Sequence, residues 1–353
     1  MLFENPYSKE VSGMKRFFLG VVFLVLAVPF VFGTAFAAQA LVGAGSTLAY
    51  PIYSAWAYEY AKTTGVQLNY QSIGSGGGIR QITNKVVDFG ASDAPLPPSE
   101  LKKDGFLQFP TVTAGVVPVV NIPGIRPGQM RLDGPTLEKI YMGEIKNWSD
   151  PRIKALNPGL NLPNHVIVTI HRAEASGTTS IFTHYLSAVS PEWKSKVGAD
   201  IAVRWPVGIG AKGSEGVTNY VKRVAYSIGY VEFAYILQEH MPYVLMKNKT
   251  GYFVSPTVAS FKEAAGKAAF SPKNGFYLWL VNAPGKGSWP IAGGTFILLN
   301  KAYPASRNNE VIKFFNWGFT HGDSADLRLT YIPLPMSLKN KIRAYWKANG
   351  LSY

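Results

Sequence analysis

The sequence of 353 residues is 47% hydrophobic and 16% charged, a globular composition that is long enough for about two domains. It has no cysteine, and its five histidines lack the spacing of metal ligands, so we expect no disulfide framework, zinc centre or thiol redox centre. The formal net charge of +14 attracts anions of every kind, but Lys and Arg are dispersed, so nucleic acid is not the expected partner.

Residues 1–37 have the pattern of a secretory signal peptide. The basic pair Lys15 and Arg16 precedes an apolar run, 17–32, that is short for a membrane span, and residues 35–37 form a small-x-small cleavage site. We expect cleavage after Ala37 and release into a periplasm, with an uncleaved membrane anchor as the alternative. Without cysteine, no lipid anchor is expected. Met14 lies just before the basic pair, so residues 1–13 are either an upstream extension or the result of a misassigned start.

The chain from residue 43 to residue 98 alternates glycine-rich loops with helices and strands. Asp93 lies at the carboxyl end of a short strand, and prolines then end the regular structure. The predicted elements are a loop at 43–48, a helix with the apolar positions Tyr53, Trp56, Ala57 and Tyr60 that ends at Gly65, a strand at 66–70, a loop at 74–78, a helix at 79–86 and a strand at 87–93.

Two apolar segments, 112–121 and 295–299, are predicted to cross between two lobes. The elements predicted between and after them are strands at 166–170 and 225–231 and helices at 136–141, 178–189, 310–319 and 337–346. Because strands alternate with helices, we predict an α/β fold with mainly parallel sheets, whose ligands collect at the carboxyl ends of the strands.

The stretch from Arg172 to Thr178 joins the strand predicted at 166–170 to the helix predicted at 178–189. A guanidinium at a strand end, followed by glycine and hydroxyls at a helix start, offers forked donors, free N–H groups and the positive end of a helix dipole. Such a group of donors suits an oxyanion. The alternative is that Ser176 only caps the helix while Arg172 forms a surface ion pair.

Three such loops together supply four hydroxyls, three helix starts, one permanent cation and one carboxylate. A carboxylate beside an anion costs about 1 to 4 kcal/mol of repulsion unless the anion carries a proton. Hydrogen phosphate has an O–H to donate and sulfate has none, so Asp93 can hydrogen-bond the first and repels the second. The hydroxyls belong to Thr47, Ser75, Ser176 and Thr178.

Seven stretches, in order, resemble the phosphate-binding proteins of bacterial phosphate-specific ABC importers over essentially the whole mature chain. They are 43–47, 73–75, 87–96, 109–112, 172–178, 228–232 and 295–298. The resemblance implies a two-lobed, type II-like periplasmic binding protein, each lobe a mainly parallel sheet flanked by helices, with two crossing segments as a hinge. Lobe I is expected to comprise 38–112 and 294–353, and lobe II 113–293. The resemblance also implies a monomer without metal or cofactor that delivers phosphate to membrane permease subunits.

By the same resemblance, nine residues are expected to bind phosphate. Asp93 would accept the ligand proton and Arg172 would pair with the anion. The others are Thr47, Leu48, Ser75, Glu174, Ser176, Gly177 and Thr178. Two positions depart from the family: Leu48 stands where an aromatic residue is usual, and Glu174 stands where aspartate is usual. The longer Glu174 leaves open whether its carboxylate touches phosphate or only braces Arg172; we expect bracing by a folded-back side chain.

Two other functions remain open at this point. One is binding of another oxyanion, such as arsenate, sulfate or molybdate. The other is a secreted phosphoester hydrolase, but the sequence has no Gly-x-Ser-x-Gly elbow, and His171 should point to the opposite side of its strand from Arg172. Residues 208–213 fit a dinucleotide fingerprint by spacing, yet without a clear βαβ context we predict a plain glycine-rich loop.

Overall fold

The first sheet is built from the alternating elements that open the computed structural model, which describes residues 40–266 and 268–353. The predicted signal peptide, its cleavage site and the candidate start at Met14 lie outside the described residues. The strand β1 (Leu41–Gly45) lies between β2 (Leu68–Ser72) and β3 (Phe89–Ser92), and all three are parallel. The strand β11 (Ala292–Asn300) runs antiparallel between β3 and β4 (Phe106–Asn121), and β12 (Ile332–Pro333) pairs with β4.

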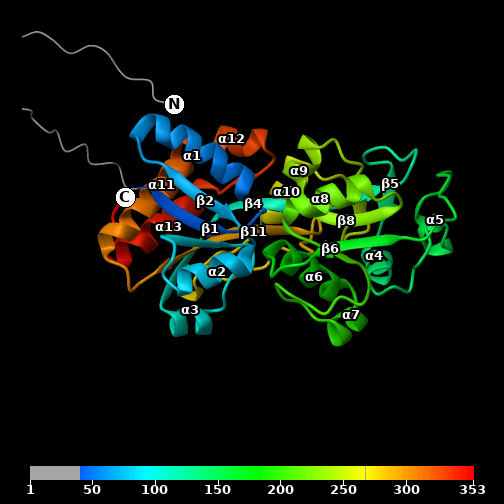
Figure 1. Ribbon diagram of the computed structural model, residues 1–353, viewed down its shortest axis with the longest axis horizontal. Coiled ribbons are helices and arrows are strands. Elements are labelled where there is room, and N and C mark those ends of the chain that lie inside the picture. The colour runs from blue at the N-terminus through cyan, green and yellow to red at the C-terminus, as the bar shows by residue number, and fades with distance from the viewer. Residues whose placement is uncertain (1–39, 267) are drawn as a thin grey trace, which may run out of the picture. The chain divides into compact units, whose positions relative to one another are not determined.

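Helices pack on the first sheet as the apolar spacing predicts. Tyr53 and Trp56 of α1 are buried and lie against aromatic residues of α11, and Gly65 ends α1 in the left-handed conformation. Figure 1 shows α1 and α2 on opposite sides of β1. The helices of this group are α1 (Tyr50–Thr64), α2 (Ser75–Thr83), α3 (Pro98–Asp104), α11 (Ala305–His321), α12 (Asp323–Arg328) and α13 (Met336–Ala348).

The second sheet continues from the far half of β4. The strand β8 (Ser227–Glu232) pairs antiparallel with β4, and β6 (Val168–Arg172) and β7 (Ile209–Ala211) follow in parallel. A small third sheet contains β10 (Phe253–Val254), β9 (Val244–Lys247) and β5 (Met130–Leu132). The helices here are α4 (Gly134–Tyr141), α5 (Pro151–Leu156), α6 (Gly177–Val189), α7 (Pro191–Lys196), α8 (Gly213–Arg223), α9 (Phe233–Gln238), α10 (Val258–Ala265) and the 3₁₀ turn η1 (Pro272–Asn274).

The strand β4 passes from one sheet to the other. It pairs with β11 up to Gly115 and with β8 from Val116 onward. The strand begins six residues earlier than the predicted crossing segment because Pro110, which lacks an N–H, sits at a register shift of the ladder rather than ending the strand. Each main sheet therefore combines parallel strands with antiparallel strands from the crossing region, and the α/β prediction is confirmed.

One prediction about local context was wrong. The glycine-rich residues 208–213 include strand β7 and lead directly into α8, which returns to β8, so a βαβ unit does surround them. The strand β7 is only three residues long, and its pairing partner is β6, which lies far from it in the sequence. This short edge strand has too few residues to show a periodic pattern.

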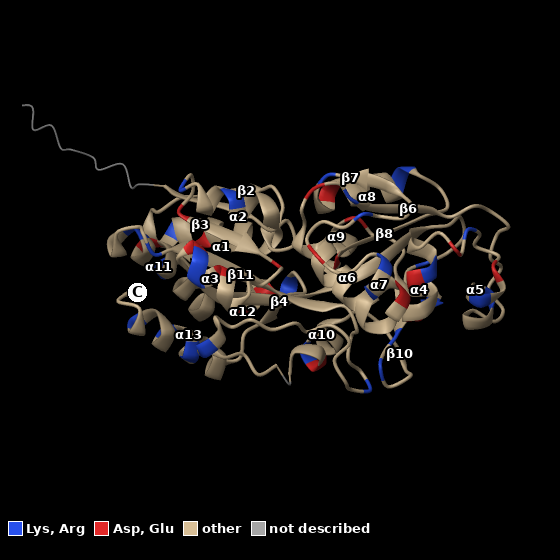
Figure 2. Ribbon diagram, turned by 90° about the horizontal axis from the view of Figure 1, so that it is seen from below, with Lys and Arg blue, Asp and Glu red and all other residues tan. Residues whose placement is uncertain are grey.

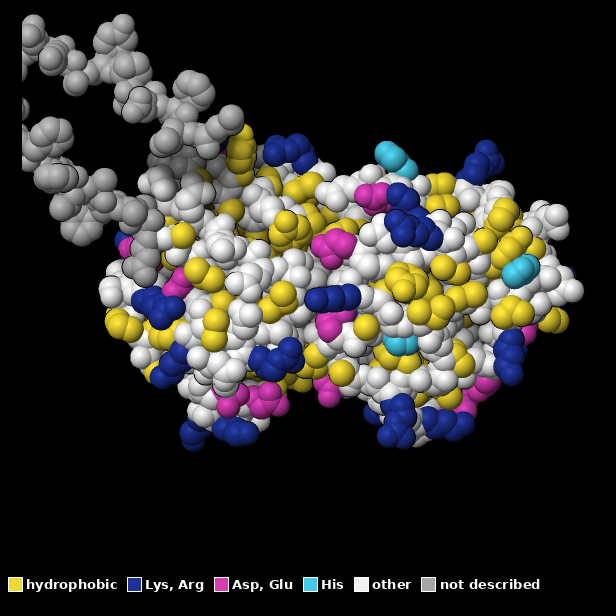
Figure 3. Space-filling view, viewed as in Figure 1, with side chains coloured by type: hydrophobic (Ala, Val, Ile, Leu, Met, Phe, Trp, Pro, Cys, Tyr) yellow, Lys and Arg dark blue, Asp and Glu magenta, His cyan; other side chains and the backbone are white. Residues whose placement is uncertain are grey.

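Charge is mixed over the surface. Figure 2 shows Lys and Arg on helices around both main sheets, and on the face in Figure 3 the basic side chains are spread over both halves, singly or in small groups. Among the described residues, only two basic side chains, those of Arg172 and Lys339, are buried. Within the same part of the chain, no helix combines the length and apolar character needed to cross a membrane.

Candidate functional site

Four helix starts meet beside the carboxyl ends of β1, β3 and β6. Their polar residues contact one another although they are far apart in sequence: Thr47 and Ser214 are separated by 167 positions and Ser75 and Gly177 by 102. The sequence predicted three helix starts here, those of α1, α2 and α6; α8 is the fourth. Helix N-termini carry free N–H groups and positive partial charge, so their convergence favours an anion.

Ser75 joins the loop after β3 to the start of α6. Its Oγ accepts hydrogen bonds from the backbone N–H of Asp93, at 3.1 Å, and of Gly177, at 3.0 Å. A Cβ at position 177 would lie 2.4 Å from Ser75 Oγ and 2.6 Å from Asp93 Cβ. Gly177 is therefore needed for this close approach, whatever else it binds.

Asp93 is a buried carboxylate held by two hydroxyls. Ser46 Oγ donates to its Oδ1 at 2.5 Å and Thr295 Oγ1 donates to the same oxygen at 2.7 Å. Burial raises the pKa of Asp93 to about 6, while these hydroxyls and the charge of Arg172 act in the opposite direction. At neutral pH the carboxylate is thus mainly ionised. Both of these hydroxyls donate to Oδ1 and not to Oδ2.

Arg172 is the last residue of β6 and is 3% exposed. Its Nε donates to Glu174 Oε1 at 2.8 Å, and its Nη2 pairs with the same oxygen. The backbone N–H of Gly213 also donates to the Glu174 carboxylate, at 3.1 Å to Oε1. Glu174 therefore folds back onto the arginine and links it to the start of α8.

The remaining guanidinium nitrogen of Arg172 faces hydroxyls. Its Nη1 lies 3.3 Å from Thr178 Oγ1 and 3.5 Å from Ser214 Oγ. Ser214 Oγ is also 2.9 Å from Thr47 Oγ1. Since Thr178, Ser214 and Thr47 are all buried, this corner combines one positive charge with three hydroxyls shielded from water.

Leu48 and Ser176 contribute in ways that the sequence left undecided. The Leu48 side chain is fully buried in the core, so only its backbone faces the polar cluster. Ser176 Oγ caps α6 by accepting from the N–H of Thr179 at 3.2 Å, which leaves its hydroxyl hydrogen for another acceptor. Ser176 therefore caps α6, and Arg172 is buried, so the alternative of a surface ion pair was wrong.

Three residues of the cluster were missed by the sequence analysis: Ser46, Ser214 and Thr295. Ser46 and Thr295 lie inside stretches that carried the family resemblance, although no role was given to them. Ser214 directly follows the glycine-rich segment 208–213. A serine at a glycine-led helix start was the available signal, and it was overlooked because β7 was not recognised.

His171 lies outside this cluster. Its ring stacks on Trp205 with 4.8 Å between centroids, and its Nδ1 is 3.0 Å from the carbonyl oxygen of Arg172. Partial burial lowers the pKa of His171. The contacts are those of a packed side chain rather than of a base beside a nucleophilic hydroxyl.

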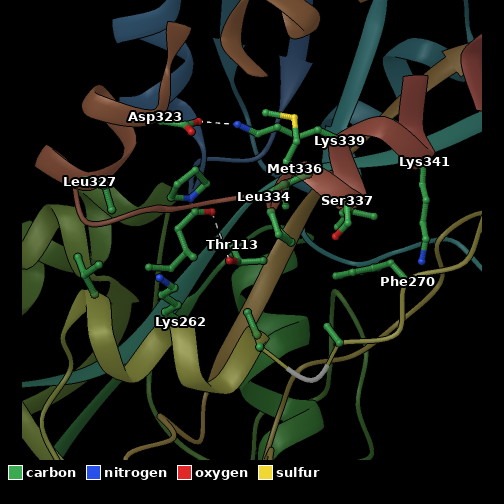
Figure 4. A pocket seen from close by; sticks show the side chains of 18 residues that line it. Thr113, Lys262, Phe270, Asp323, Leu327, Leu334, Met336, Ser337, Lys339 and Lys341 are labelled. Carbon is green, nitrogen blue, oxygen red and sulfur yellow. Dashed lines mark hydrogen bonds and ion pairs between the residues drawn. The ribbon is translucent and has the colours of Figure 1, made fainter. Parts of the chain in front are cut away.

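A groove of about 610 Å³ lies elsewhere, between α10, β12 and the start of α13. Figure 4 shows Lys262, Phe270 and Lys341 around it, and Lys339 paired with Asp323 at its edge. None of the nine predicted site residues lines this groove. The residues of the polar cluster, by contrast, are buried and hydrogen-bonded to one another.

Comparisons with known proteins show the family and the fold of this chain. The model of the PBP superfamily domain matches residues 32–320. The phosphate-binding protein PstS of Haemophilus influenzae is 47% identical over 312 residues, covering 88% of this chain and 93% of that protein. PstS of Pasteurella multocida is 48% identical over 311 residues, covering 88% and 90%. The structure of a high-affinity periplasmic phosphate-binding protein (PfluDING) bound with phosphate has a TM-score of 0.69 at 21% identity, covering 87% of this chain and 93% of that one, a likeness of fold.

Proposed function

This chain belongs to the PBP superfamily and, within it, to the phosphate-binding protein family PstS, and we propose that it binds inorganic phosphate at the polar cluster for delivery to an ABC importer. The observation that carries the proposal is a buried arginine beside a buried carboxylate at four helix starts. The cation and the helix starts favour an anion, and the carboxylate favours an anion that carries a proton.

Each residue of the proposed site has a distinct task. Arg172 supplies the charge and Glu174 orients it, while Asp93 accepts the ligand proton. Backbone N–H groups and hydroxyls supply the other donors; they belong to Thr47, Leu48, Ser75, Ser176, Gly177 and Thr178, to which the geometry adds Ser214. No hydrolysis is proposed, since His171 is packed against Trp205.

The proposed location is the periplasm, as stated for the structurally similar PfluDING protein. In this proposal the chain is cut after Ala37, remains a monomer without a lipid anchor and docks on the membrane permease subunits of the importer. The intact mass of the exported protein tests the cleavage site: a mass that still includes residues 1–37 contradicts it.

We further propose that lobes I and II, joined by β4 and β11, close around phosphate. The contacts of Ser75 with Gly177 and of Thr47 with Ser214 would each cross from lobe I to lobe II, so they would form only on closure. A ligand that touches both lobes favours the state in which both can reach it.

Calorimetric titration with phosphate, arsenate, sulfate and molybdate tests the function. We expect heat of binding with phosphate and none with sulfate at neutral pH, because sulfate offers no proton to Asp93. Small-angle scattering on the same samples should give a smaller radius of gyration with phosphate. Preference for sulfate or molybdate, or turnover of a phosphoester, would contradict the proposed function. An unchanged radius of gyration in a sample that binds phosphate would contradict only the closure of the lobes.

Glu174→Asp tests whether Glu174 braces Arg172 without touching the ligand. We expect phosphate affinity to change by less than about tenfold, or 1.4 kcal/mol, because the shorter carboxylate can still reach the arginine but gives up the Gly213 N–H. Titrating affinity from pH 5 to pH 8 should give parallel curves for the variant and the parent. Diverging curves would mean that the carboxylate contacts phosphate directly.

A further inference from the structure

Glu232, at the end of β8, is a fully buried carboxyl group outside the nine predicted site residues. Its Oε1 accepts a hydrogen bond from the N–H of Ala234 at 2.8 Å, and its Oε2 lies 3.2 Å from the hydroxyl oxygen of Tyr331. That hydroxyl lies 2.6 Å from the carbonyl oxygen of Leu48, at the entrance to α1. A chain of oxygen atoms thus connects β8 to the loop that carries Thr47 and Leu48.

The number of hydrogen atoms available in this chain decides which of its groups must be the donor. A carbonyl oxygen never donates, so the shorter contact, from Tyr331 to Leu48, uses the single hydroxyl hydrogen of the tyrosine. The contact between Tyr331 and Glu232 then lacks a hydrogen if Glu232 is ionised. It becomes a hydrogen bond only when Glu232 is protonated and donates to the tyrosine oxygen.

The surroundings of Glu232 also favour the neutral form. The titratable groups that interact with it are Asp93, which follows β3, Tyr235 of α9, and Tyr331, which precedes β12. Among the described residues, Glu232 takes part in no ion pair. Burial without a cation, and the negative charge of Asp93, raise the pKa of Glu232 well above its usual range.

We propose that Glu232 is a positioning residue that is protonated in the closed protein, donates through Tyr331 to the Leu48 carbonyl, and takes up its proton as the lobes close on the ligand. The proposal rests on the proposed function, since it needs an open form. In the proposed lobes, Leu48 and Tyr331 belong to lobe I and Glu232 to lobe II. The link between them therefore orders the Thr47–Leu48 loop only when the lobes meet.

The pH dependence follows from the sign of this change. In the proposed open form Glu232 meets water and has its ordinary pKa, whereas in the closed form burial lets it hold its proton to higher pH. Between these two limits each binding event takes up one proton. Phosphate affinity should then fall by up to about tenfold for each unit of rising pH, relative to a protein whose side chain 232 cannot ionise.

Glu232→Gln supplies that comparison. Its carbonyl can accept from Ala234, and its amide can donate to Tyr331 as the protonated acid does. Calorimetry of phosphate binding at pH 7 in buffers of different ionisation enthalpy counts the protons taken up. We expect the parent to take up about one proton more than the variant, since phosphate and Asp93 contribute equally to both. From pH 5 to pH 8, the phosphate affinities of the parent and of the variant should diverge by up to about tenfold for each pH unit.

Glu215→Gln is the matched control. The Tyr235 hydroxyl oxygen lies 2.7 Å from the Thr47 carbonyl oxygen and 2.9 Å from Glu215 Oε1. This tyrosine therefore links a carboxylate to a backbone carbonyl in the same way as Tyr331 does. Glu215, however, is exposed, and water can supply the missing hydrogen. We expect its replacement to leave the proton count of the parent unchanged. Tyr331→Phe removes both hydrogen bonds of the link and should weaken phosphate binding by about 5- to 100-fold.

An equal proton count in the parent and Glu232→Gln, both binding phosphate, overturns this inference but not phosphate binding. If the variant does not fold, the infrared difference spectrum of the parent with and without phosphate decides the question. A new C=O stretch of a protonated carboxyl group supports the inference, and its absence contradicts it. A parent that binds no phosphate at all would instead overturn the proposed function.

Discussion

Arg172→Ala is expected to weaken phosphate binding by about 2 to 5 kcal/mol, or about 30- to 4,000-fold. Arg172 is 3% exposed, and its guanidinium is the cation that the structure places among the site hydroxyls. Its loss leaves an anion among dipoles alone, with the Glu174 carboxylate nearby and no longer paired. Calorimetric titration of the folded variant measures the effect.

Arg152→Ala is the control for overall charge. Arg152 pairs with Asp150 through Nε and Nη2, as Arg172 pairs with Glu174, but its side chain is 46% exposed. Both variants lose one positive charge, so a purely long-range attraction would weaken binding equally in both. Combining Arg172→Ala with Glu174→Ala removes the unpaired carboxylate and isolates the contribution of the cation. Binding within about threefold of the parent, below 1 kcal/mol, would contradict a role for Arg172 in the site.

Asp93→Asn is expected to reduce the discrimination between phosphate and sulfate by several kcal/mol. The carboxylate offers only acceptors at neutral pH, whereas the amide can turn its NH₂ group toward sulfate and remove the repulsion between two negative charges. Asparagine can still accept a hydrogen bond from the phosphate O–H through its carbonyl oxygen, so phosphate binding should survive in part. Separate titrations with the two anions give the ratio of affinities.

The pKa of Asp93, raised to about 6 by burial, adds a test in the parent protein. Below that pH the carboxyl group is protonated and becomes a donor, so sulfate should bind better at pH 5 than at pH 8. In Asp93→Asn the part of this pH dependence that comes from Asp93 should disappear, so the ratio of sulfate affinities at pH 5 and pH 8 should be smaller than in the parent. Two results would show that Asp93 is not the source of the selectivity. In one, the parent excludes sulfate equally at both pH values; in the other, the parent and the variant exclude sulfate equally.

Asp326→Asn serves as the matched control for a buried carboxyl group. Asp326 is 2% exposed and accepts a hydrogen bond from Trp56 Nε1 at 3.1 Å, and burial raises its pKa to about 8. The substitution makes the same chemical change on α12, outside the polar cluster. We expect the phosphate-to-sulfate ratio to remain that of the parent.

The sequence by itself determined the parts of the site that are local. Gly177 after a strand and before a helix, Ser176 as its cap and Asp93 at a strand end all follow from residues within a few positions of one another. Such features depend on backbone conformation and on helix-terminal N–H groups, which short stretches of sequence specify. The same reasoning placed Arg172 at the end of its strand, while leaving open whether it would be exposed.

Only the tertiary structure decided which of these groups meet and how deeply they are buried. Asp93 receives the hydroxyl of Thr295, 202 positions away, and Tyr331 joins Glu232 to Leu48 across 99 and 283 positions. These contacts depend on the ladders that β4 forms with β11 on one half and β8 on the other, and a shift of one residue would turn Thr295 to the opposite face. Burial of Arg172 and Glu232 follows from that pairing, because desolvation is a property of the assembled site and not of any one stretch.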